Sequence, residues 1–291
     1  MFCTNCGNEI KENEKFCTKC GNGVSSIQAP QTSQIKKSKN LFTNRKFIIG
    51  ASIFILVVAF LLFYQDQESV TTQRNQDITS AVVNIYCTGD SEEESSGGSG
   101  TIFSEDGMVL TNAHIIPQTA QGDAQCIVIL PDPVTGSADE MYLAYPIVVP
   151  ELSENYDLAF IQIHDVYYDQ EEGIAYGEYP KKFPTYNGNQ YCKNENVQLG
   201  ESVRIYGYPA ISGGYSLTVT DGIVSSFPGE GLIITSAKIS YGNSGGLAVD
   251  RYGCMIGIPS MVTGDENESL GIIISNDLIS SFADEISNLP E

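Results

Sequence analysis

Residues 47–64 form an uncharged, strongly apolar run of 18 residues, and this run constrains the fold more than any other feature. As a helix it would extend about 27 Å, close to the hydrocarbon thickness of a bilayer. Five lysine and arginine residues lie at 36–46, whereas Asp66 and Glu68 follow the run. Because positively charged flanks stay in the cytoplasm, the pattern predicts a transmembrane helix with a cytoplasmic N-terminus and an extracytoplasmic C-terminal part.

A cleaved signal peptide and a buried helix are the alternatives for this run. A signal peptide is disfavoured because 46 residues precede the run and no small-x-small cleavage site follows it. The sequence therefore predicts a single-pass protein of the cell membrane. A basic linker at 25–46 precedes the membrane helix, and a polar tether at 65–77 follows it.

The charge of the chain changes sign across the apolar run. Residues 1–46 carry a balance of +5 and the remaining residues a balance of −26, which together give the net charge of −21. An acidic surface repels the phosphates of nucleic acids. Nucleic acid is therefore excluded as a partner of the C-terminal part.

Two identical cysteine pairs, Cys3-x-x-Cys6 and Cys17-x-x-Cys20, lie in the first 24 residues, each followed by Gly-Asn. This spacing is typical of two knuckles that bind one tetrahedral zinc ion, and the segment resembles short zinc ribbons. Two disulfides are the alternative, but the segment is expected on the reducing side of the membrane. We expect residues 1–24 to hold a structural Zn²⁺ and to dock a cytosolic partner.

The motif Gly-Asn-Ser-Gly-Gly around Ser244 indicates a nucleophilic hydroxyl. Gly242 lets the backbone curl so that amide groups converge, and the two glycines after Ser244 are expected to leave room for a substrate. A serine needs a base and a group that orients the base. His114 in Thr-Asn-Ala-His and Asp157 in Tyr-Asp-Leu-Ala-Phe are the candidates, in the order His, Asp, Ser.

Four blocks in this order, Gly-Ser-Gly at 98–100, Thr-Asn-Ala-His, Asp-Leu-Ala-Phe and Gly-Asn-Ser-Gly-Gly, resemble the trypsin-like serine proteases, and most closely their HtrA/Deg branch. Short apolar runs separated by Gly-rich turns favour an all-β domain at 78–291. The resemblance implies two six-stranded antiparallel barrels, with His114 and Asp157 in the first and Ser244 in the second. Residues 168–191 have few strand signals and are interpreted as the interbarrel loop, and 276–286 as one closing helix.

The resemblance also implies the roles of further residues. The amides of Gly242 and Ser244 would form the oxyanion hole. The specificity pocket would be lined by Lys238, six residues before the serine, and by Ile258, Pro259 and Ser260. Two readings of Lys238 stay open: a preference for acidic side chains, or a lysine turned outward over apolar walls that favour aliphatic side chains.

The remaining four cysteines all follow the apolar run, where oxidising conditions are expected. An even number favours two disulfides, for which three pairings exist. We favour Cys87–Cys126 and Cys192–Cys254, since each pair lies within one half of the domain. Buried free thiols are the alternative.

Together these features predict a membrane-anchored serine endopeptidase that cleaves exported or misfolded proteins through a His-Asp-Ser triad, with no cofactor for catalysis. One rival is an inactive protease-fold protein that binds peptides or signals across the membrane. Another is a zinc-ribbon adaptor. The intact set of His114, Asp157 and Ser244 favours the enzyme, because an inactive relative would usually have lost one of them.

Overall fold

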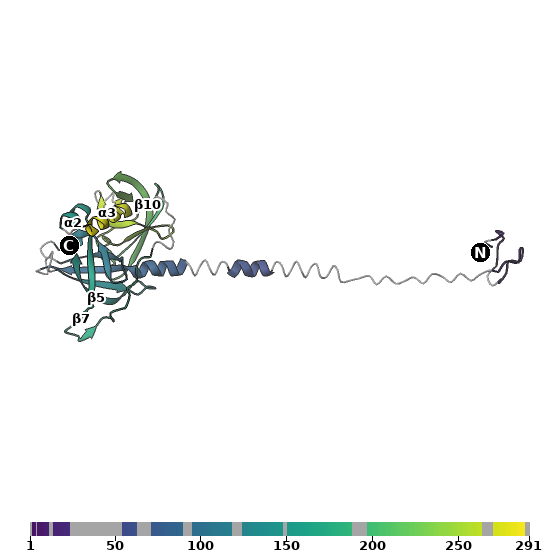
Figure 1. The fold of residues 1–291 in the computed structure, drawn as a ribbon, viewed down its shortest axis with the longest axis horizontal. Coiled ribbons are helices and arrows are strands. Elements are labelled where there is room, and N and C mark those ends of the chain that lie inside the picture. The colour runs from purple at the N-terminus through teal and green to yellow at the C-terminus, as the bar shows by residue number, and fades with distance from the viewer. Residues whose placement is uncertain are drawn as a thin grey trace. The chain divides into compact units, whose positions relative to one another are not determined.

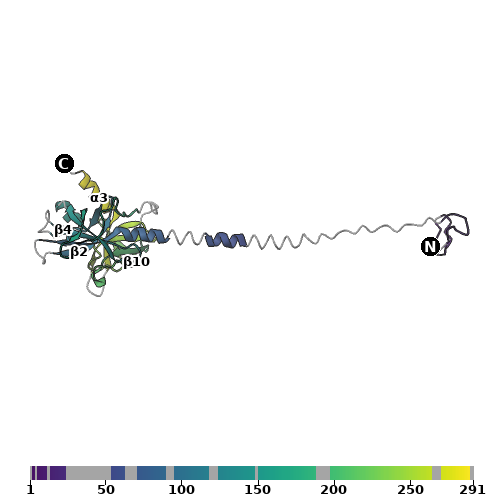
Figure 2. The same cartoon turned by 90° about the horizontal axis from the view of Figure 1, so that it is seen from below.

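The computed structural model describes residues 2–3, 5–11, 14–23, 54–62, 71–89, 95–117, 124–147, 150–187, 197–263 and 270–288 (Figures 1 and 2). The chain divides into two compact units, Met1–Leu62 and Phe63–Glu291. The first unit holds the N-terminal cysteines, and the second holds all the strands of the two barrels.

The N-terminal cysteine segment is built from one short motif used twice. The amide of Cys3 donates to the carbonyl of Asn8, and the amide of Gly7 donates to that of Cys3, each at 2.8 Å. The same two bonds recur at Cys17, with the same lengths. Gly7 has a φ of 73°, in the left-handed region that favours glycine, so each turn needs the glycine that follows its second cysteine.

The predicted membrane segment is described in part. Residues 54–62 are helical and exposed, and the rest of 47–64 lies outside the described residues. Within the part of the chain that the structure describes, no helix is both long enough and apolar enough to cross a membrane.

The second unit contains the two closed six-stranded antiparallel barrels that were predicted. The first barrel has the strand order β1-β2-β3-β6-β5-β4. Its strands are β1 (Val82–Thr88), β2 (Ser96–Ile102), β3 (Met108–Thr111), β4 (Gln125–Pro131), β5 (Ala138–Ile147) and β6 (Ala159–Val166). The second barrel has the order β10-β11-β14-β13-β12-β9. Its strands are β9 (Ser202–Gly207), β10 (Thr218–Gly229), β11 (Leu232–Thr235), β12 (Leu247–Asp250), β13 (Met255–Thr263) and β14 (Leu270–Ser275).

Short elements join and close the barrels. They are the 3₁₀ turns η2 (Ala113–Ile115) and η5 (Ala210–Ser212), the helix α2 (Pro150–Tyr156), the hairpin β7 (Tyr168–Asp169) with β8 (Ile174–Ala175), and the helix α3 (Asn276–Ser287). The closing helix is thus confirmed, one residue longer than predicted. The hairpin, which extends from the first barrel in Figure 1, lies within 168–191, the segment between β6 and β9 that was interpreted as the interbarrel loop. Its strands are only two residues long, too short to produce an alternating pattern.

Alternating side chains give each barrel its own core. Val83, Ile85 and Cys87 of β1 are fully buried in the first core. Because successive residues of a strand face opposite sides, Asn84 and Tyr86 lie on the outer face. A third apolar cluster joins the barrels beneath α3, where Phe282 stacks on Phe160 of β6 with ring centres 5.6 Å apart. The barrels are therefore held as one body.

The predicted polar tether at 65–77 is described from residue 71 onward, and residues 71–81 are helical. Ile78 and Ala81 of this segment are buried, and Ile78 packs in a cluster with residues of β9 and β12. Arg74 donates through Nη1 to the carbonyl of Tyr252 at 3.0 Å. Polar composition concealed the helix, since only one side of it meets the domain.

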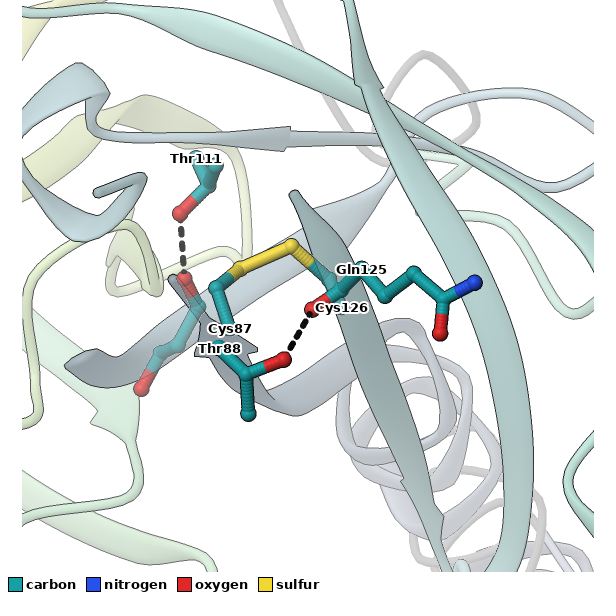
Figure 3. The surroundings of a disulfide bond; sticks show 6 residues. Cys87, Thr88, Thr111, Gln125 and Cys126 are labelled. Atoms are coloured by element: carbon teal, nitrogen blue, oxygen red, sulfur yellow. Dashed lines mark hydrogen bonds between the residues drawn. A yellow bond between two sulfur atoms is a disulfide. The ribbon is translucent and has the colours of Figure 1, made fainter. Parts of the chain in front are cut away.

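The disulfide Cys87–Cys126 is confirmed (Figure 3). It links β1 to β4 at directly opposed positions, beside a hydrogen bond from Thr88 Oγ1 to the carbonyl of Gln125. Cys254 is also disulfide-bonded. Cys192 lies outside the described residues, so the pair Cys192–Cys254 stays a prediction.

We expect replacement of both Cys87 and Cys126 by alanine to lower the free energy of unfolding by about 2–4 kcal/mol, because the bond closes a loop in the unfolded chain. Urea unfolding of the full chain, followed by circular dichroism, measures the change. Reduced wild-type protein loses both this bond and that of Cys254, so it should be no more stable than the double variant. Equal stability of the double variant and the oxidised wild type would contradict the expectation.

Candidate active site

His114 lies at the end of the first barrel's strand β3. The strand ends at Thr111, and His114 follows in the turn η2, where the chain leaves the barrel. Its neighbour Ile115 is buried in the core and fixes the turn. The imidazole stays about half exposed, with a side-chain exposure of 47%. The backbone at His114 is therefore fixed by the turn, while about half of the imidazole surface is accessible to a substrate.

Asp157 enters the same region from the turn between α2 and β6. It has a φ of 51°, one of two non-glycine residues with positive φ in the described chain. Aspartate tolerates this left-handed conformation better than most residues. The turn carries the carboxylate to η2, where the backbone amide of His114 donates to Oδ1 at 3.2 Å.

The imidazole and the carboxylate form a close pair. His114 Nδ1 lies 2.9 Å from Asp157 Oδ1 and 3.0 Å from Oδ2. An ionised carboxylate only accepts hydrogen bonds, so Nδ1 carries the proton in this contact. In the neutral ring, Nε2 is then an unprotonated acceptor. This is the tautomer that a general base requires.

Two further side chains orient Asp157, and sequence reasoning did not assign this role to either. Asn112 Nδ2 donates to Oδ2 at 3.1 Å and to the backbone carbonyl of Asp157 at 2.8 Å. Ser260 Oγ donates to Oδ2 at 2.6 Å. Asn112 is part of the Thr-Asn-Ala-His block, which is the signal that could have found it. Ser260 was predicted only as a residue of the specificity pocket.

The loop around Ser244 needs its glycines because the chain is crowded. Gly242 has a φ of 95°, and a Cβ there would lie 2.3 Å from the carbonyl oxygen of Tyr208. A Cβ on Gly245 would lie 2.1 Å from the carbonyl oxygen of Ser99. Gly245 and Gly246 were expected to make room for substrate. The structure corrects this, because their missing side chains let backbone segments pack against each other.

Ser99 of β2 holds this loop against the first barrel. Its amide donates to the carbonyl of Ser244 at 2.8 Å, and its hydroxyl donates to the carbonyl of Gly242 at 2.6 Å. The same hydroxyl accepts from the amide of Tyr208 at 2.8 Å. Ser99 is fully buried, so these bonds are shielded from water. The Gly-Ser-Gly block that carries the family resemblance thus positions the loop of the second barrel.

The hydroxyl of Ser244 donates to the carbonyl of Ser260 at 2.5 Å. Among the described residues, no hydrogen bond joins Ser244 to His114. The structure therefore brings His114 and Asp157 into contact and connects Ser244 to them through Ser260. A rotation about the Cα–Cβ bond of Ser244 would redirect its hydroxyl, and catalytic contacts often tighten only when substrate binds.

The predicted oxyanion donors are unengaged. Within the described chain, the amides of Gly242 and Ser244 donate to no protein acceptor, whereas the next amides in the loop are bonded. Asn243 donates to Ser240, and Gly245 to Pro259, both at 2.9 Å. Two free amides that flank a bonded one leave donors for an oxygen atom of a ligand.

The four predicted specificity residues differ in their surroundings. Lys238 is exposed, and its carbonyl accepts from Thr220 Oγ1 at 2.7 Å. Ile258 is fully buried in the cluster beneath α3, and Pro259 is buried beside it. A cavity of about 600 Å³ between the barrels is lined by Ser260 together with Asp157. The roles of these residues in specificity stay predictions.

The four N-terminal thiols form a second candidate site. Their sulfur atoms all lie within 4.8 Å of one another, with Cys3–Cys20 and Cys6–Cys17 at 3.7 Å. Zinc–sulfur bonds of about 2.3 Å at tetrahedral angles place the sulfur atoms about 3.8 Å apart. The donor set and its spacing therefore fit a tetrahedral zinc ion.

The thiols of this cluster differ in acidity. A backbone hydrogen bond from Asn22, with contacts to Cys6, lowers the pKa of the Cys20 thiol to about 6. For the Cys6 thiol, a backbone hydrogen bond from Asn8 lowers the pKa, but contacts with Cys20 and the other sulfurs outweigh it and raise the pKa to about 12. A thiolate at Cys20 thus makes it harder for the neighbouring Cys6 thiol to lose its proton. A bound cation would relieve the opposition.

The barrels, the His114–Asp157 pair and the serine loop with free amides define a chymotrypsin-fold domain of the serine-protease class. The family model of the trypsin-like peptidase domain matches residues 98–258, and this chain belongs to that family. A model of the zinc-ribbon domain matches residues 2–24.

Relatives of this chain include HtrA and DegP-like serine proteases. The chain is 31% identical to serine protease HTRA3 of Mus musculus over 208 residues, which cover 66% of this chain and 38% of the relative. It is 31% identical to a probable periplasmic serine endoprotease, DegP-like, of Brucella suis over 182 residues, or 60% and 29% of the two chains. The matches thus span well under half the length of these relatives.

Among solved structures, the serine endoprotease of Yersinia pestis is similar, with a TM-score of 0.53 and 28% identity. The match covers 73% of this chain and 66% of that one.

Proposed function

We propose that this protein is a membrane-anchored serine endopeptidase of the HtrA type. The observation that carries the proposal is the contact of His114 Nδ1 with both oxygens of Asp157, which leaves Nε2 free to accept a proton. Ser260 supports it, because its hydroxyl bonds Asp157 while its carbonyl accepts from Ser244. The three triad residues therefore belong to one connected network.

In the proposed reaction, Ser244 turns its hydroxyl to His114 and attacks a peptide carbonyl. His114 Nε2 takes the hydroxyl proton and then gives it to the leaving amine. Asp157 stabilises the imidazolium, and the amides of Gly242 and Ser244 bind the oxyanion. Such donors are worth roughly 3–4 kcal/mol each in transition-state stabilisation. Water then releases the acyl group by the same steps.

The substrate class follows from the relatives and the membrane topology predicted by the sequence. The named relatives are serine proteases, one of them called periplasmic. If residues 47–64 anchor the chain, the protease domain lies outside the cytoplasm, where it meets exported or misfolded proteins. Lys238 would then favour acidic residues before the scissile bond if it turns inward. Its exposed position supports the aliphatic alternative.

The cytoplasmic ribbon would hold one structural Zn²⁺ through Cys3, Cys6, Cys17 and Cys20. All four positions of a tetrahedral ion are then taken by protein, so this zinc organises the segment and has no part in hydrolysis. A folded ribbon on the cytoplasmic side would present a surface to a partner there.

A fluorophosphonate probe tests the proposed activity, because it labels only a serine that its surroundings have activated. We expect the full-length protein in detergent to be labelled, and Ser244→Ala to lose the label completely. Ser226→Ala, on β10, is the matched control and should label like the wild type. Absence of label on the wild type at every pH between about 6 and 9 would favour the rival of an inactive protease-fold protein.

A further inference from the structure

The outer face of the first barrel is apolar where strands β1, β4 and β5 meet. Tyr86, Ile127, Ile129 and Met141 belong to the half of their strands that does not join the first barrel's core. The register brings them together, since Tyr86 is paired with Ile127, and Ile129 with Met141. Solvent-facing positions of a barrel are normally polar. Ile129 is buried, whereas Tyr86 is 43% exposed and Ile127 and Met141 are partly exposed, so this apolar patch on the outer face needs an explanation.

This patch forms one wall of a cavity of about 470 Å³, within the range of about 300–1,000 Å³ common for ligand pockets. The opposite wall comes from the second barrel, chiefly Tyr208, Gly214, Tyr215 and Tyr241. The side chains that line it are mostly apolar or aromatic. A substrate residue with a large apolar side chain would fill this space and lose little hydration.

The second wall is fastened to the first barrel. Asn84 Nδ2 donates to the carbonyl of Gly214 at 2.5 Å. The amide of Leu217 donates to the carbonyl of Gly136 at 2.9 Å, next to a bridge between Ser137 and Ser216. The cavity is therefore formed by two walls with fixed spacing, before any ligand binds.

The cavity reaches the proposed reaction centre at Gly242, which is among its lining residues and supplies one oxyanion donor. The other cavity, at Asp157 and Ser260, shares no lining residue with it. The family resemblance places the pocket for the residue before the scissile bond at Ile258–Ser260 of β13. The part of an extended substrate that follows this bond is therefore expected on the other side of Ser244. On that side it meets Gly242 and the apolar wall.

We propose that this cavity binds a large apolar or aromatic side chain of the substrate, one or two residues after the scissile bond. The inference rests on the proposed peptidase function and adds a specificity for the substrate residues that follow the scissile bond. Tyr241 and Tyr215, 91% and 64% exposed, stand at the rim, where their rings would pack on the incoming side chain. Charged side chains would lose hydration in the cavity without gaining a partner.

The test uses the full-length protein in detergent micelles. Its cleavage sites in denatured β-casein are first mapped by mass spectrometry. Quenched fluorescent peptides then keep the acyl side of one mapped site and carry Phe, Leu, Ser or Asp at the two following positions. We expect kcat/KM to be at least about tenfold higher for Phe or Leu than for Ser or Asp, a difference typical of apolar pockets.

Tyr86→Ser and Met141→Ser should reduce this preference to less than about threefold, chiefly by lowering kcat/KM for the Phe and Leu peptides. Tyr145→Ser is the matched control, because Tyr145 is also an outward tyrosine of this barrel, 48% exposed against 43% for Tyr86, and does not line the cavity. Equal rates for the Phe and Ser peptides in the wild type would overturn the inference. So would a preference that survives both variants.

A binding measurement separates this inference from the proposed function. Ser244→Ala protein is titrated with labelled product-like peptides that begin with Phe-Leu or with Ser-Asp, and anisotropy is recorded. In one outcome the wild type cleaves nothing, but the Phe-Leu peptide binds more tightly than the Ser-Asp peptide, and adding Tyr86→Ser abolishes this difference in affinity. The peptidase proposal then fails and the apolar subsite stands. If the wild type cleaves and neither peptide is preferred, the subsite fails alone.

Discussion

Asp157→Asn is expected to lower kcat by about 10⁴-fold while the protein stays folded. Both carboxylate oxygens contact Nδ1 of His114, which fixes the proton on that nitrogen. An amide would offer an N–H group to the ring and favour the wrong tautomer, with Nε2 protonated and unable to accept from Ser244. The bonds from Asn112 and Ser260 would hold the amide in place, so the geometry would persist. Steady-state kinetics on denatured casein peptides measure the loss.

Asp221→Asn on β10 controls for the removal of one negative charge, because Asp221 is exposed and distant in the chain from both halves of the pair. It should keep kcat within a factor of two of the wild type, since surface substitutions rarely matter. Circular dichroism and the melting temperature of Asp157→Asn should match those of the wild type. A loss of kcat below tenfold with an unchanged fold would mean that Asp157 does not set the tautomer.

The second large effect concerns the N-terminal cysteines. We expect the full chain to carry one zinc ion, and Cys17→Ser to carry none. Zinc contributes about 10–16 kcal/mol to the folding of comparable peptides at neutral pH, far more than so short a segment gains from its own burial. Without the ion, residues 2–23 should unfold and become sensitive to trypsin at Lys11, Lys15 and Lys19. Metal analysis and limited proteolysis record both changes.

Lys11→Ser is the control within the same segment, because the Lys11 side chain lies outside the sulfur cluster. It should bind zinc as the wild type does. Fluorophosphonate labelling of Ser244 should be the same in Cys17→Ser as in the wild type, since the cysteines belong to the other compact unit. A Cys17→Ser protein that retains stoichiometric zinc would contradict the four-thiol site. Loss of label would contradict the independence of the two units.

The residues that carry chemistry were predictable because their motifs are local. The Thr-Asn-Ala-His and Gly-Asn-Ser-Gly-Gly blocks identify His114 and Ser244 without knowledge of the fold. The knuckle spacing likewise brings the four thiols together. The barrels followed from the family resemblance and from short apolar runs. Cys87 and Cys126 could be paired because both lie in the first half of the domain, although only the structure shows that their strands are neighbours.

What the sequence did not reveal depends on contacts between distant segments. The bond from Ser260 to Asp157 joins positions 103 residues apart. No local pattern distinguishes a serine that supports an acid from one that lines a pocket. Similarly, Gly245 was predicted to leave room for substrate. Its actual role is a close approach to Ser99, which belongs to the other barrel and so could not be recognised from the local sequence. The helix at 71–81 was missed for the same reason, since its burial comes from strands of the second barrel.

The bonds of Ser99 have a consequence for a chain that is still being made. The base and the acid come from the first barrel, whereas the serine loop comes from the second and is fastened at Ser99. On the proposed chemistry, a newly emerged chain with only its first half folded has no nucleophile and cannot cut its neighbours. Proteolytic activity would then appear only after the second barrel has folded. An incompletely synthesised chain would therefore be unable to cleave neighbouring proteins.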